Sequence, residues 1–596
     1  MVFNSTALRA LPALAAACLL SVALPASPAL AQKTKTKTKT PPAPTFAVDH
    51  SVSIPSLDAV DSNVSDEVLT AILSGAIAEN ADALAGLDAA SITVPEIAVA
   101  ISTRHGETST QTVFTLNDLV LTNVVDGVAT TISLGSIDIS SDEANAAFGT
   151  MSAANFDIGG MLGVYGLVDT GGRTTIETIY TDFSASGGSL TGDGLECNIG
   201  AVSGAEFKAR PLKTSFVDMM ALAQAMEDDP DSIDPALIGH VARMYADIFT
   251  AFETSEIRFD GMSCDGLDDD GQVMNFDITG IVMGAMSPGI YPSIAMDGFS
   301  VVVDGEGEVT LDNLTIKPMD LSAAIATLEN LPANVDEAWF DANARLLVPA
   351  MDGFSFAGLT IDIPDPDDED ARILANIGGF DLSLANYVNG IPSDIDISAS
   401  NVQATLPEGG DEAIEQLRAL GITEVDASLR LAAAWDEASE TITIKEISAS
   451  GVDLGTIALA GTIANASADL FALDENTALM AGMSVAVKSL SMSVSDAGLV
   501  DLVLNMVAAE QGGDVTQLRP IYADLAKGTL ISLLAGVADA AKLGDAVGGF
   551  IKGEAKTLEI GITAKNDPGL AMEDFIAAEE NPASLLGKVN ISADAR

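Results

Sequence analysis

Basic residues are scarce in this chain of 596 residues, in which 27 Lys and Arg stand against 86 Asp and Glu, for a net charge of −59. Nucleic-acid binding needs a basic surface that neutralises phosphates, so the composition excludes this class of function. A bare anionic membrane surface would also repel the protein unless divalent cations intervene. The partners that remain are lipids with neutral or cation-bridged headgroups and other proteins.

Histidine and the common catalytic motifs are also lacking. The three histidines, His50, His105 and His240, do not have the spacing of metal ligands, which argues against a His-based zinc site. The chain contains no Gly-x-Ser-x-Gly elbow, P-loop or dinucleotide fingerprint. Carboxylates are too numerous for any one pair to indicate a general acid and base. We therefore predict no catalytic residue and no cofactor, and expect a non-enzymatic protein.

Cysteine is limited to three residues, of which Cys18 lies in an expected signal peptide, residues 1–31. This segment has an apolar stretch and ends in Ala29-Leu30-Ala31, a small-x-small cleavage site. Export to the periplasm or the extracellular space follows. Cys197 and Cys264 occupy apolar positions of strand patterns, and in an oxidising compartment we expect them to form a disulfide. The alternative is a pair of buried free thiols.

Long apolar runs are missing beyond the signal peptide. No stretch of about 18 uninterrupted apolar residues remains, so no transmembrane helix is predicted. Yet 48% of the residues are hydrophobic, which is too many for a disordered chain. A large apolar content together with a high charge predicts large buried faces opposite strongly acidic ones.

The chain does contain a recurring pattern of eight residues with apolar side chains at positions 1, 3, 6 and 8. The steps of two are the period of a half-buried strand, and the central step of three keeps the apolar set on one face, as a β-bulge does. Filler pairs such as Asp297-Gly298 tolerate the positive φ of a bend. The pattern occurs at Ile92–Val99, Phe114–Leu121, Ile132–Ile139, Ile257–Cys264, Phe276–Met283, Ile294–Val301, Val309–Ile316 and Phe354–Ile361, with looser copies at Ile442–Ala449, Val452–Leu459 and Val485–Met492.

Helical patterns interrupt these strands, mostly in pairs. They are expected at residues 65–87, 215–253, 321–330, 336–347, 411–420 and 499–551. The predicted fold class is therefore α+β and β-dominated, with repeated blocks of bulged, curved antiparallel sheet interrupted by helical pairs. The expected organisation is a signal peptide (1–31), a Lys/Thr/Pro tether (32–45), a β-rich half with helical pairs (46–363), an acidic linker (364–370) and a second β-rich half (371–596).

One acidic stretch partly imitates a calcium loop. Asp268, Asp270 and Asp277 have the spacing of ligands, and Gly271 takes the place of the invariant glycine. Position 1 would be Gly266, which has no ligand, and strands rather than helices flank the stretch. A calcium site and a plain acidic turn both remain open.

Residues 427–462, which include SLRLAAAWDEASETITIKEISASG, resemble strand blocks in AsmA-like and related β-rich proteins of the Gram-negative envelope. The resemblance rests on the strand pattern, not on a functional motif. It implies a periplasmic, lipid-related context and assigns no site residues.

The leading hypothesis is an exported, non-enzymatic envelope protein that binds or handles a lipid, or another envelope protein, on an apolar curved sheet. The alternatives are a structural or adhesive acidic surface protein stabilised by calcium, and a hydrolase whose site is invisible in the sequence. Helices that close an ordinary core would explain the same pattern without any ligand. The candidate lipid-facing residues are Phe276, Ile278, Ile294, Met296, Val309 and Phe354.

Overall fold

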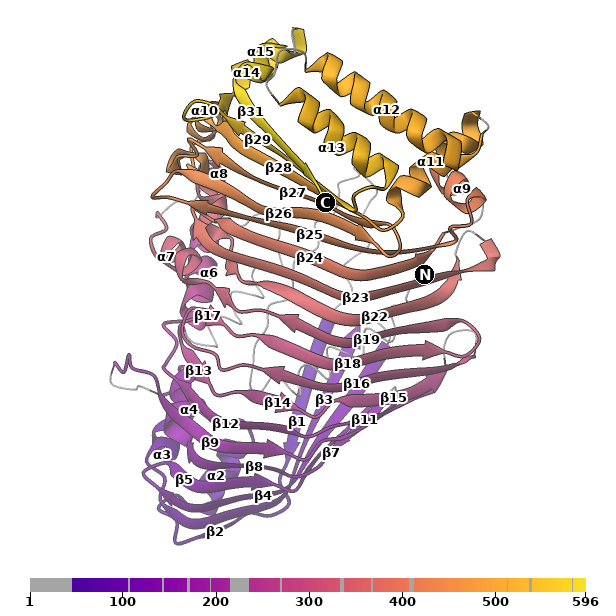
Figure 1. The fold of residues 1–596 in the computed structure, drawn as a ribbon. Coiled ribbons are helices and arrows are strands. Elements are labelled where there is room, and N and C mark those ends of the chain that lie inside the picture. The colour runs from indigo at the N-terminus through magenta and orange to yellow at the C-terminus, as the bar shows by residue number, and fades with distance from the viewer. Residues whose placement is uncertain are drawn as a thin grey trace, which may run out of the picture. The chain divides into compact units, whose positions relative to one another are not determined.

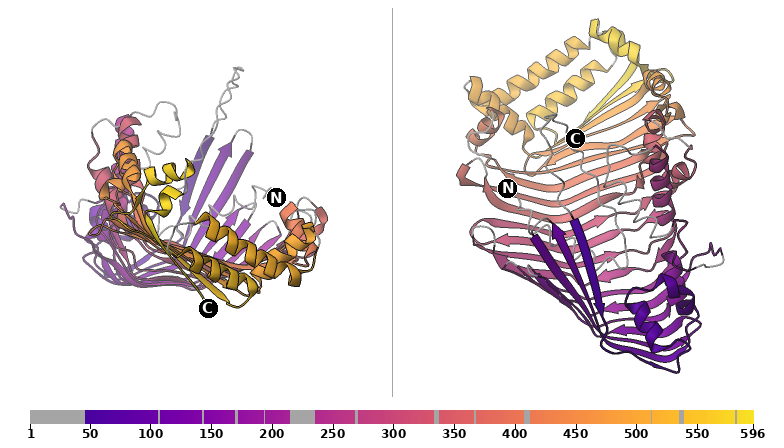
Figure 2. Two further views of the ribbon diagram at one scale, coloured as in Figure 1. Left: turned by 45° about the horizontal axis from the view of Figure 1, so that its top comes forward. Right: turned by 180° about the vertical axis from the view of Figure 1, so that it is seen from behind.

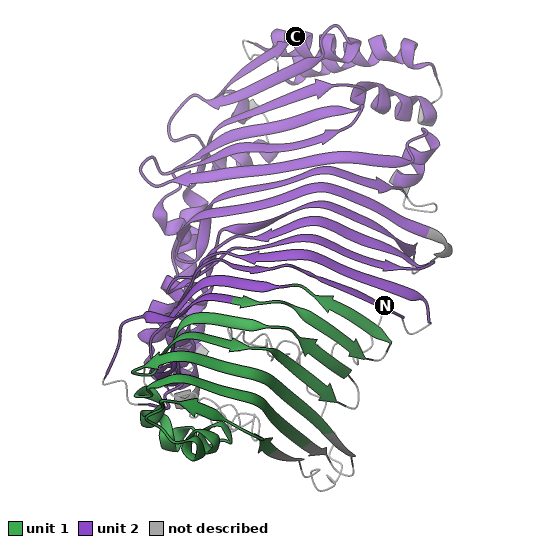
Figure 3. Ribbon diagram, turned by 90° about the horizontal axis from the view of Figure 1, so that it is seen from below, with its two compact units in different colours: residues 1–156, 184–200 green, residues 157–183, 201–596 purple. Residues whose placement is uncertain are grey.

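The computed structural model describes residues 46–105, 108–141, 144–168, 172–192, 194–214, 235–267, 271–332, 337–365, 368–406, 412–511, 513–534, 539–580 and 583–596. The predicted signal peptide and tether lie outside these residues, as does the first helix expected within 215–253. Strands make up 51% and helices 26% of the structure, which confirms the β-dominated α+β class. The chain forms two compact units, unit 1 (1–156 and 184–200) and unit 2 (157–183 and 201–596) (Figure 3).

Unit 1 is built on antiparallel strands, and short helices lie between the second and the third of them, where one helix was expected at 65–87. These are α2 (Asp66–Leu73), η1 (Ala78–Asn80) and α3 (Ala81–Ala85), and Leu69 and Ile72 of α2 are buried. Strand β3 is central to this unit, because it pairs with β1 and β2 on one side and with β4 on the other. The strands are β1 (Phe46–Ser53), β2 (Asp58–Val60), β3 (Ala89–His105), β4 (Thr108–Val125), β5 (Val128–Leu134), β6 (Ser136–Ser141), β7 (Ala144–Phe148), β8 (Met151–Asp157), β10 (Gly188–Gly192) and β11 (Leu195–Ile199).

Unit 2 is dominated by an antiparallel meander in which, from β16 to β29, each strand pairs with the next long strand along the chain (Figure 1). β14 and β15 both pair with β16, each along one half of it. The main strands are β12 (Val202–Ala209), β14 (Ile257–Phe259), β15 (Met262–Leu267), β16 (Val273–Met283), β18 (Ile294–Val303), β19 (Gly307–Ile316), β22 (Gly353–Asp365), β23 (Asp368–Val388), β24 (Ile391–Thr405), β25 (Glu424–Asp436), β26 (Thr441–Gly451), β27 (Gly455–Ala464), β28 (Ala486–Asp496), β29 (Thr557–Ala564) and β31 (Val589–Ala595).

Short strands complete the unit. β13 (Phe252–Thr254) pairs with β12, and β30 (Leu570–Ala571) pairs with the start of β28. β17 (Ile290–Tyr291), β20 (Met319–Asp320) and β21 (Ala350–Met351) form a separate small sheet. β9 (Glu177–Ala185) lies mostly in unit 2, where the ring of Tyr180 stacks on Phe207 and burial raises the pKa of Tyr180 to about 12.

The strands of the meander share a line of interruption, which we call the crease, and Figure 3 shows them bending there together. Between β16 and β18, pairing skips the facing residues Thr279 and Gly298 and then resumes in the same register. Equivalent gaps face one another on the neighbouring strands. The crease residues are Gly261, Thr279, Gly298, Asp312, Gly358, Gly378 and Asn401, and each falls on the central step of three in its strand or on the equivalent position.

In the strands from β16 to β24, the crease corrects the expectation of individual β-bulges. A bulge places two residues of one strand opposite one of its partner, but here both partners carry the extra residue, so the register does not shift. Left-handed backbone appears only on alternate strands, with φ of +57° at Gly298 and +65° at Gly358 and nothing comparable at Thr279 or Asp312. True register shifts occur between β24 and β25, after Ala399, and on the later strands. The shift on β26 between Ile444 and Ile447 confirms the bulge expected in the looser copy at 442–449, and the shift between β27 and β28 lies within the copy at 485–492.

Helices of unit 2 follow the sequence-based expectation in most places. The helical patterns at 321–330, 336–347, 411–420 and 499–551 correspond to α7, α8, α9 and the three helices α11–α13. Five short helical segments, α4, η2, α10, α14 and α15, were not expected. The bounds are α4 (Ile158–Val164), α6 (Pro235–Ile248), α7 (Ser322–Glu329), α8 (Glu337–Leu347), α9 (Glu412–Ala419), η2 (Ala468–Phe471), α10 (Glu475–Ser484), α11 (Leu499–Gln511), α12 (Val515–Leu533), α13 (Ala540–Lys552), α14 (Met572–Glu580) and α15 (Ala583–Leu586).

The acidic run 364–370 is not a linker between two halves. β22 ends at Asp365, β23 begins at Asp368, and these two residues are paired across one hairpin. The strands on either side belong to the same sheet, so the expected division into 46–363 and 371–596 is wrong. The run looked like a linker because proline and acidic residues are also common in exposed turns.

Candidate functional site

One face of the unit 2 sheet is apolar along its whole length. In an antiparallel sheet, paired residues project from the same face, so the register connects side chains into rows across the strands. One such row crosses twelve strand segments without a polar side chain: Ile257, Met283, Ile294, Ile316, Phe354, Leu382, Ile397, Leu431, Ile447, Leu459, Met492 and Ile560.

Three more rows extend this surface, which we call the apolar face. The row between the first and the crease is Phe259, Ile281, Met296, Leu314, Phe356, Phe380, Ala399, Leu429, Ala449, Ile457, Val494 and Leu558. Beyond the crease lie two shorter rows, which pass through Ile278, Phe299 and Leu359, and through Phe276, Val301 and Val309.

The six candidate residues from the sequence all lie on this face. Ile294 and Phe354 belong to the first row, Met296 to the second, and Ile278, Phe276 and Val309 to the rows beyond the crease. All six are half-buried, and none is sealed from solvent as a core residue would be. Phe354 and Phe356 both stack on Phe380 at 5.3 Å between ring centroids, so the aromatic side chains pack along the face rather than across a second layer.

The most open part of the apolar face lies on β25, β26 and β27. Leu429, Leu431, Ile447 and Ile457 are between 40% and 56% exposed. Leu431 is paired with Ile447, and Ala449 connects Leu429 to Ile457, so the four form one contiguous patch. The sequence-based candidates stopped short of this patch, although the looser copies at 442–449 and 452–459 contained two of its residues.

The C-terminal end of the apolar face is covered by helices. Phe550 of α13 packs on Val494 and Leu558, the last members of the second row, together with Met492 and Ile560 of the first. α13 packs on β29 and β31, and α12 packs on α13 (Figure 2). The rows therefore run from an uncovered region into a closed one.

Other helices line one side of the sheet instead of covering it. α6 packs on α7, and α7 packs on α8. The side chain of Arg345 at the end of α8 donates to the carbonyl of Ala472, next to η2, and Phe471 of η2 packs on Trp435 of β25 at 4.8 Å. Figure 1 shows these helices in one column along the strand ends.

The opposite face of the sheet is polar and ion-paired. Arg430 of β25 bridges Asp396 of β24 and Glu446 of β26, and Lys445 pairs with Asp394. The hydrogen bond from Arg430 holds the pKa of Asp396 below its usual range. Because alternate residues of a strand project to opposite faces, this charged surface is the solvent-facing side of the sheet and lies opposite the apolar face.

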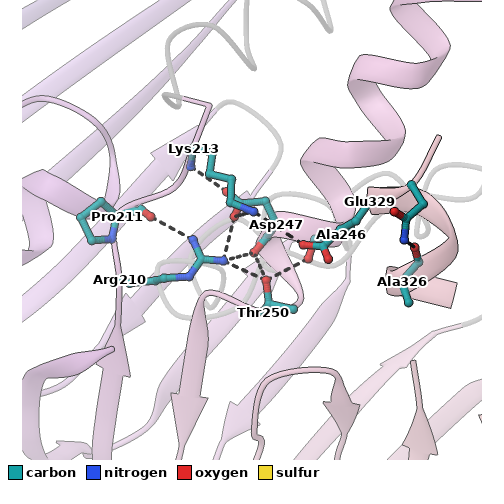
Figure 4. A network of polar contacts seen from close by, with 9 residues as sticks. Arg210, Pro211, Lys213, Ala246, Asp247, Thr250, Ala326 and Glu329 are labelled. Atoms are coloured by element: carbon teal, nitrogen blue, oxygen red, sulfur yellow. Dashed lines mark hydrogen bonds and ion pairs between the residues drawn. The ribbon is translucent and has the colours of Figure 1, made fainter. Parts of the chain in front are cut away.

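Two buried carboxylates of unit 2 have structural partners and are not free for catalysis. Asp247 of α6, 4% exposed, forms an ion pair with Arg210 at 2.7 Å and accepts a hydrogen bond from the backbone N–H of Lys213 (Figure 4). Asp496 accepts hydrogen bonds from the N–H groups of Gly498 and Val500 at the start of α11. The first anchors α6 to the end of β12, and the second caps α11.

The possible calcium ligands are only partly described. Asp268 and Asp270 lie outside the described residues, and Asp277 is paired with Ser263 and Ser300 on the polar side of β16. Among the residues that the structure describes, no group of three His, Cys, Asp or Glu side chains is arranged to hold a metal ion. The calcium site stays a prediction.

The two cysteines beyond the predicted signal peptide are buried in strands, Cys197 in β11 and Cys264 in β15, and both are disulfide-bonded. This confirms the disulfide expected from the sequence.

Comparison with known proteins gives little functional information. A family model described only as an uncharacterized protein matches residues 448–596, which is about a quarter of the chain and runs from β26 to the C-terminus. No curated protein matches, and no solved structure matches. Within the described residues, no helix is long and apolar enough to cross a membrane.

Proposed function

We propose that this protein binds a lipid through its acyl chains on the apolar face of unit 2, as an exported, non-enzymatic protein of the cell envelope. The observation that carries the proposal is the exposure of 40–56% at Leu429, Leu431, Ile447 and Ile457. These four neighbouring aliphatic side chains belong to the continuous apolar face and lie just before the end that α13 covers. The strand block that resembles AsmA-like proteins forms the same three strands. The predicted signal peptide and the disulfide support a location outside the cytoplasm.

The outline of the apolar face has the size of a binding surface. From β14 to β27 its first two rows cross ten strand segments, or about 40 Å at the usual strand spacing, and they extend about 13 Å along the strands. The outline of these two rows is about 500 Å², the size of the largest apolar patch on a typical soluble protein, which is often a functional one. Each buried methylene gains about 0.8 kcal/mol, so ten methylenes supply about 8 kcal/mol against the cost of association.

The charge of the protein predicts which lipids it prefers. With 27 Lys and Arg in the chain, anionic headgroups find few cations, and the polar face already pairs Arg430 and Lys445 internally. Neutral headgroups, or anionic ones bridged by a divalent cation, should therefore bind in preference to bare phosphates.

The direct test is purification of the full exported chain without detergent, followed by mass spectrometry of co-purifying lipid. Ile278→Asp and Met296→Asp should abolish lipid retention and leave a folded protein, because a half-exposed position accepts a carboxylate in water. Thr310→Asp is the matched control, since Thr310 lies on β19 between Val309 and Leu311 and projects from the polar face.

Two results would contradict the proposal. If Ile278→Asp and Met296→Asp prevent folding while Thr310→Asp does not, the face is a sealed core in which a charge cannot be buried. If the folded wild type carries no lipid and binds no fluorescent fatty acid, the structural or adhesive interpretation of the acidic surface takes precedence.

A further inference from the structure

A second apolar surface of unit 2 lies on two short helices that were not expected from the sequence. Leu479, Met480 and Met483 of α10 and Met572, Phe575 and Ile576 of α14 are all between 40% and 66% exposed. On each helix two of these residues are adjacent in sequence and the third lies three and four positions away from them, so they form one stripe per helix. We call these six residues the α10–α14 corner.

The sheet brings the two helices together. α10 ends at Ser484, two residues before β28, and α14 begins at Met572, directly after β30. Ala486 of β28 is paired with Ala571 of β30, so the end of α10 and the start of α14 meet at one end of the same ladder. Figure 1 shows both helices at this corner of the sheet.

The corner is connected to the apolar face. Helix α10 follows η2 by a few residues, and Phe471 of η2 packs on Trp435 of β25. Trp435 lies four residues after Leu431 on this strand, so both side chains project from the apolar face. The corner therefore lies beside the end of the surface that we propose to hold acyl chains.

The composition of the corner favours a lipid bilayer over a protein partner. Six apolar side chains are far fewer than the 20–30 residues a side that a stable protein interface buries. Glu475, Glu573 and Glu579 stand on the same helices, so a second copy of the chain would bring like charges together. A bilayer surface needs no matching shape, and Met, Leu, Phe and Ile are side chains that enter the boundary between headgroups and acyl chains.

We propose that the α10–α14 corner docks this protein onto a bilayer of neutral headgroups, at the place where lipid reaches or leaves the apolar face. Docking is supported by the exposure of the corner residues, whereas the role in lipid exchange rests on the function proposed above. Because acidic residues flank the corner, zwitterionic surfaces should bind better than anionic ones.

The test is co-sedimentation of the full chain with phosphatidylcholine vesicles in EDTA, and in parallel with phosphatidylglycerol vesicles. The double variant Met480→Asp/Ile576→Asp should lower binding to phosphatidylcholine at least tenfold. Ile521→Asp is the matched control, because Ile521 is equally exposed at 60% but stands on α12, which packs on α11 and α13. It should bind like the wild type.

The outcomes separate this inference from the proposed function. Ile278→Asp should lose its bound lipid yet still sediment with phosphatidylcholine vesicles, whereas the corner variant should keep its bound lipid and stay in solution. Docking is refuted if the wild type does not sediment, if the corner variant sediments as well as the wild type, or if phosphatidylglycerol is preferred. Should Asp disturb folding, Met480→Gln/Ile576→Gln must give the same loss, and circular dichroism must show an unchanged fold.

Discussion

The crease predicts that glycines which look alike in the sequence differ strongly in how much their replacement by alanine destabilises the protein. Gly298 lies on β18 with φ at +57°, and a Cβ built there would lie 2.2 Å from Oγ1 and 3.0 Å from Cβ of Thr279 on the neighbouring strand. Gly298→Ala therefore meets two obstacles. The left-handed backbone costs an L-residue about 1–2 kcal/mol, and forcing an extra methyl group against a packed neighbour costs about 1–3 kcal/mol.

Two other glycines separate these contributions. Gly271 has φ at +81° but no atom within 4 Å of a built Cβ, so Gly271→Ala should cost only the backbone part, about 1–2 kcal/mol. Gly482, within α10, has neither a positive φ nor a close neighbour, and Gly482→Ala should stabilise the protein by about 0.5–1 kcal/mol. Gly298→Ala should exceed Gly271→Ala by about 1–3 kcal/mol.

The measurement is urea denaturation followed by far-ultraviolet circular dichroism and by tryptophan fluorescence. One of the two tryptophans, Trp435 on β25, is hydrogen-bonded to the carbonyl of Ala466, which follows β27. Adding Thr279→Ala to Gly298→Ala should recover part of the loss, because it removes the hydroxyl oxygen nearest the new methyl group. Equal effects of Gly298→Ala and Gly271→Ala would show that the crease has no close packing. A loss below 1 kcal/mol at Gly298 would show that the backbone is not left-handed there.

Three further predictions concern polar groups and the disulfide. Arg210→Met leaves the carboxylate of Asp247 buried without its main partner, and it should lower the free energy of unfolding by about 3–5 kcal/mol in urea denaturation. The double variant Arg210→Met/Asp247→Asn should lower it clearly less. If the losses of the two single variants simply add, the pair is not coupled. Arg430 lowers the pKa of Asp396 in the folded state, so the contribution of Asp396 to stability is present above the unfolded-state pKa and disappears as the pH falls through the lower, folded-state pKa. Asp396→Asn should therefore destabilise the protein at pH 7 and not at pH 2. A loss of stability that does not change with pH would contradict this. Thiol titration of denatured, unreduced protein should find Cys197 and Cys264 unreactive and should find both after reduction; two free thiols before reduction would end the disulfide assignment.

Much of the fold was available from the sequence because the apolar pattern and the backbone geometry agree at each strand. The step of three at Asp297-Gly298 identified the position of the bend, and the alternation of Phe276, Ile278, Ile294 and Met296 placed these side chains on one face. The shared register of the crease was not available, since a single strand does not reveal whether its partner carries an extra residue at the same level.

Other features depend on contacts that a linear pattern does not contain. The acidic run 364–370 has the composition of a linker and of a hairpin turn, and only the pairing of Asp365 with Asp368 separates the two. The open patch at Leu429 and Ile447 was missed because exposure depends on where the covering helices end. Helices α10 and α14 were missed although they are longer than α7 and α9, which were expected. In α10, Gly482 weakens the helical signal.

The meander has a consequence for how such a protein changes over evolutionary time. Because each long strand from β16 to β29 pairs with its neighbour in the chain, a hairpin inserted anywhere in this stretch finds partners on both sides and leaves every other pairing intact. Each added hairpin lengthens the sheet by about 10 Å, twice the strand spacing. If its strands keep the eight-residue pattern, the crease and the apolar rows continue through it. The length of the apolar surface is thus a property that duplication and deletion of hairpins adjust in discrete steps, without redesign of either end.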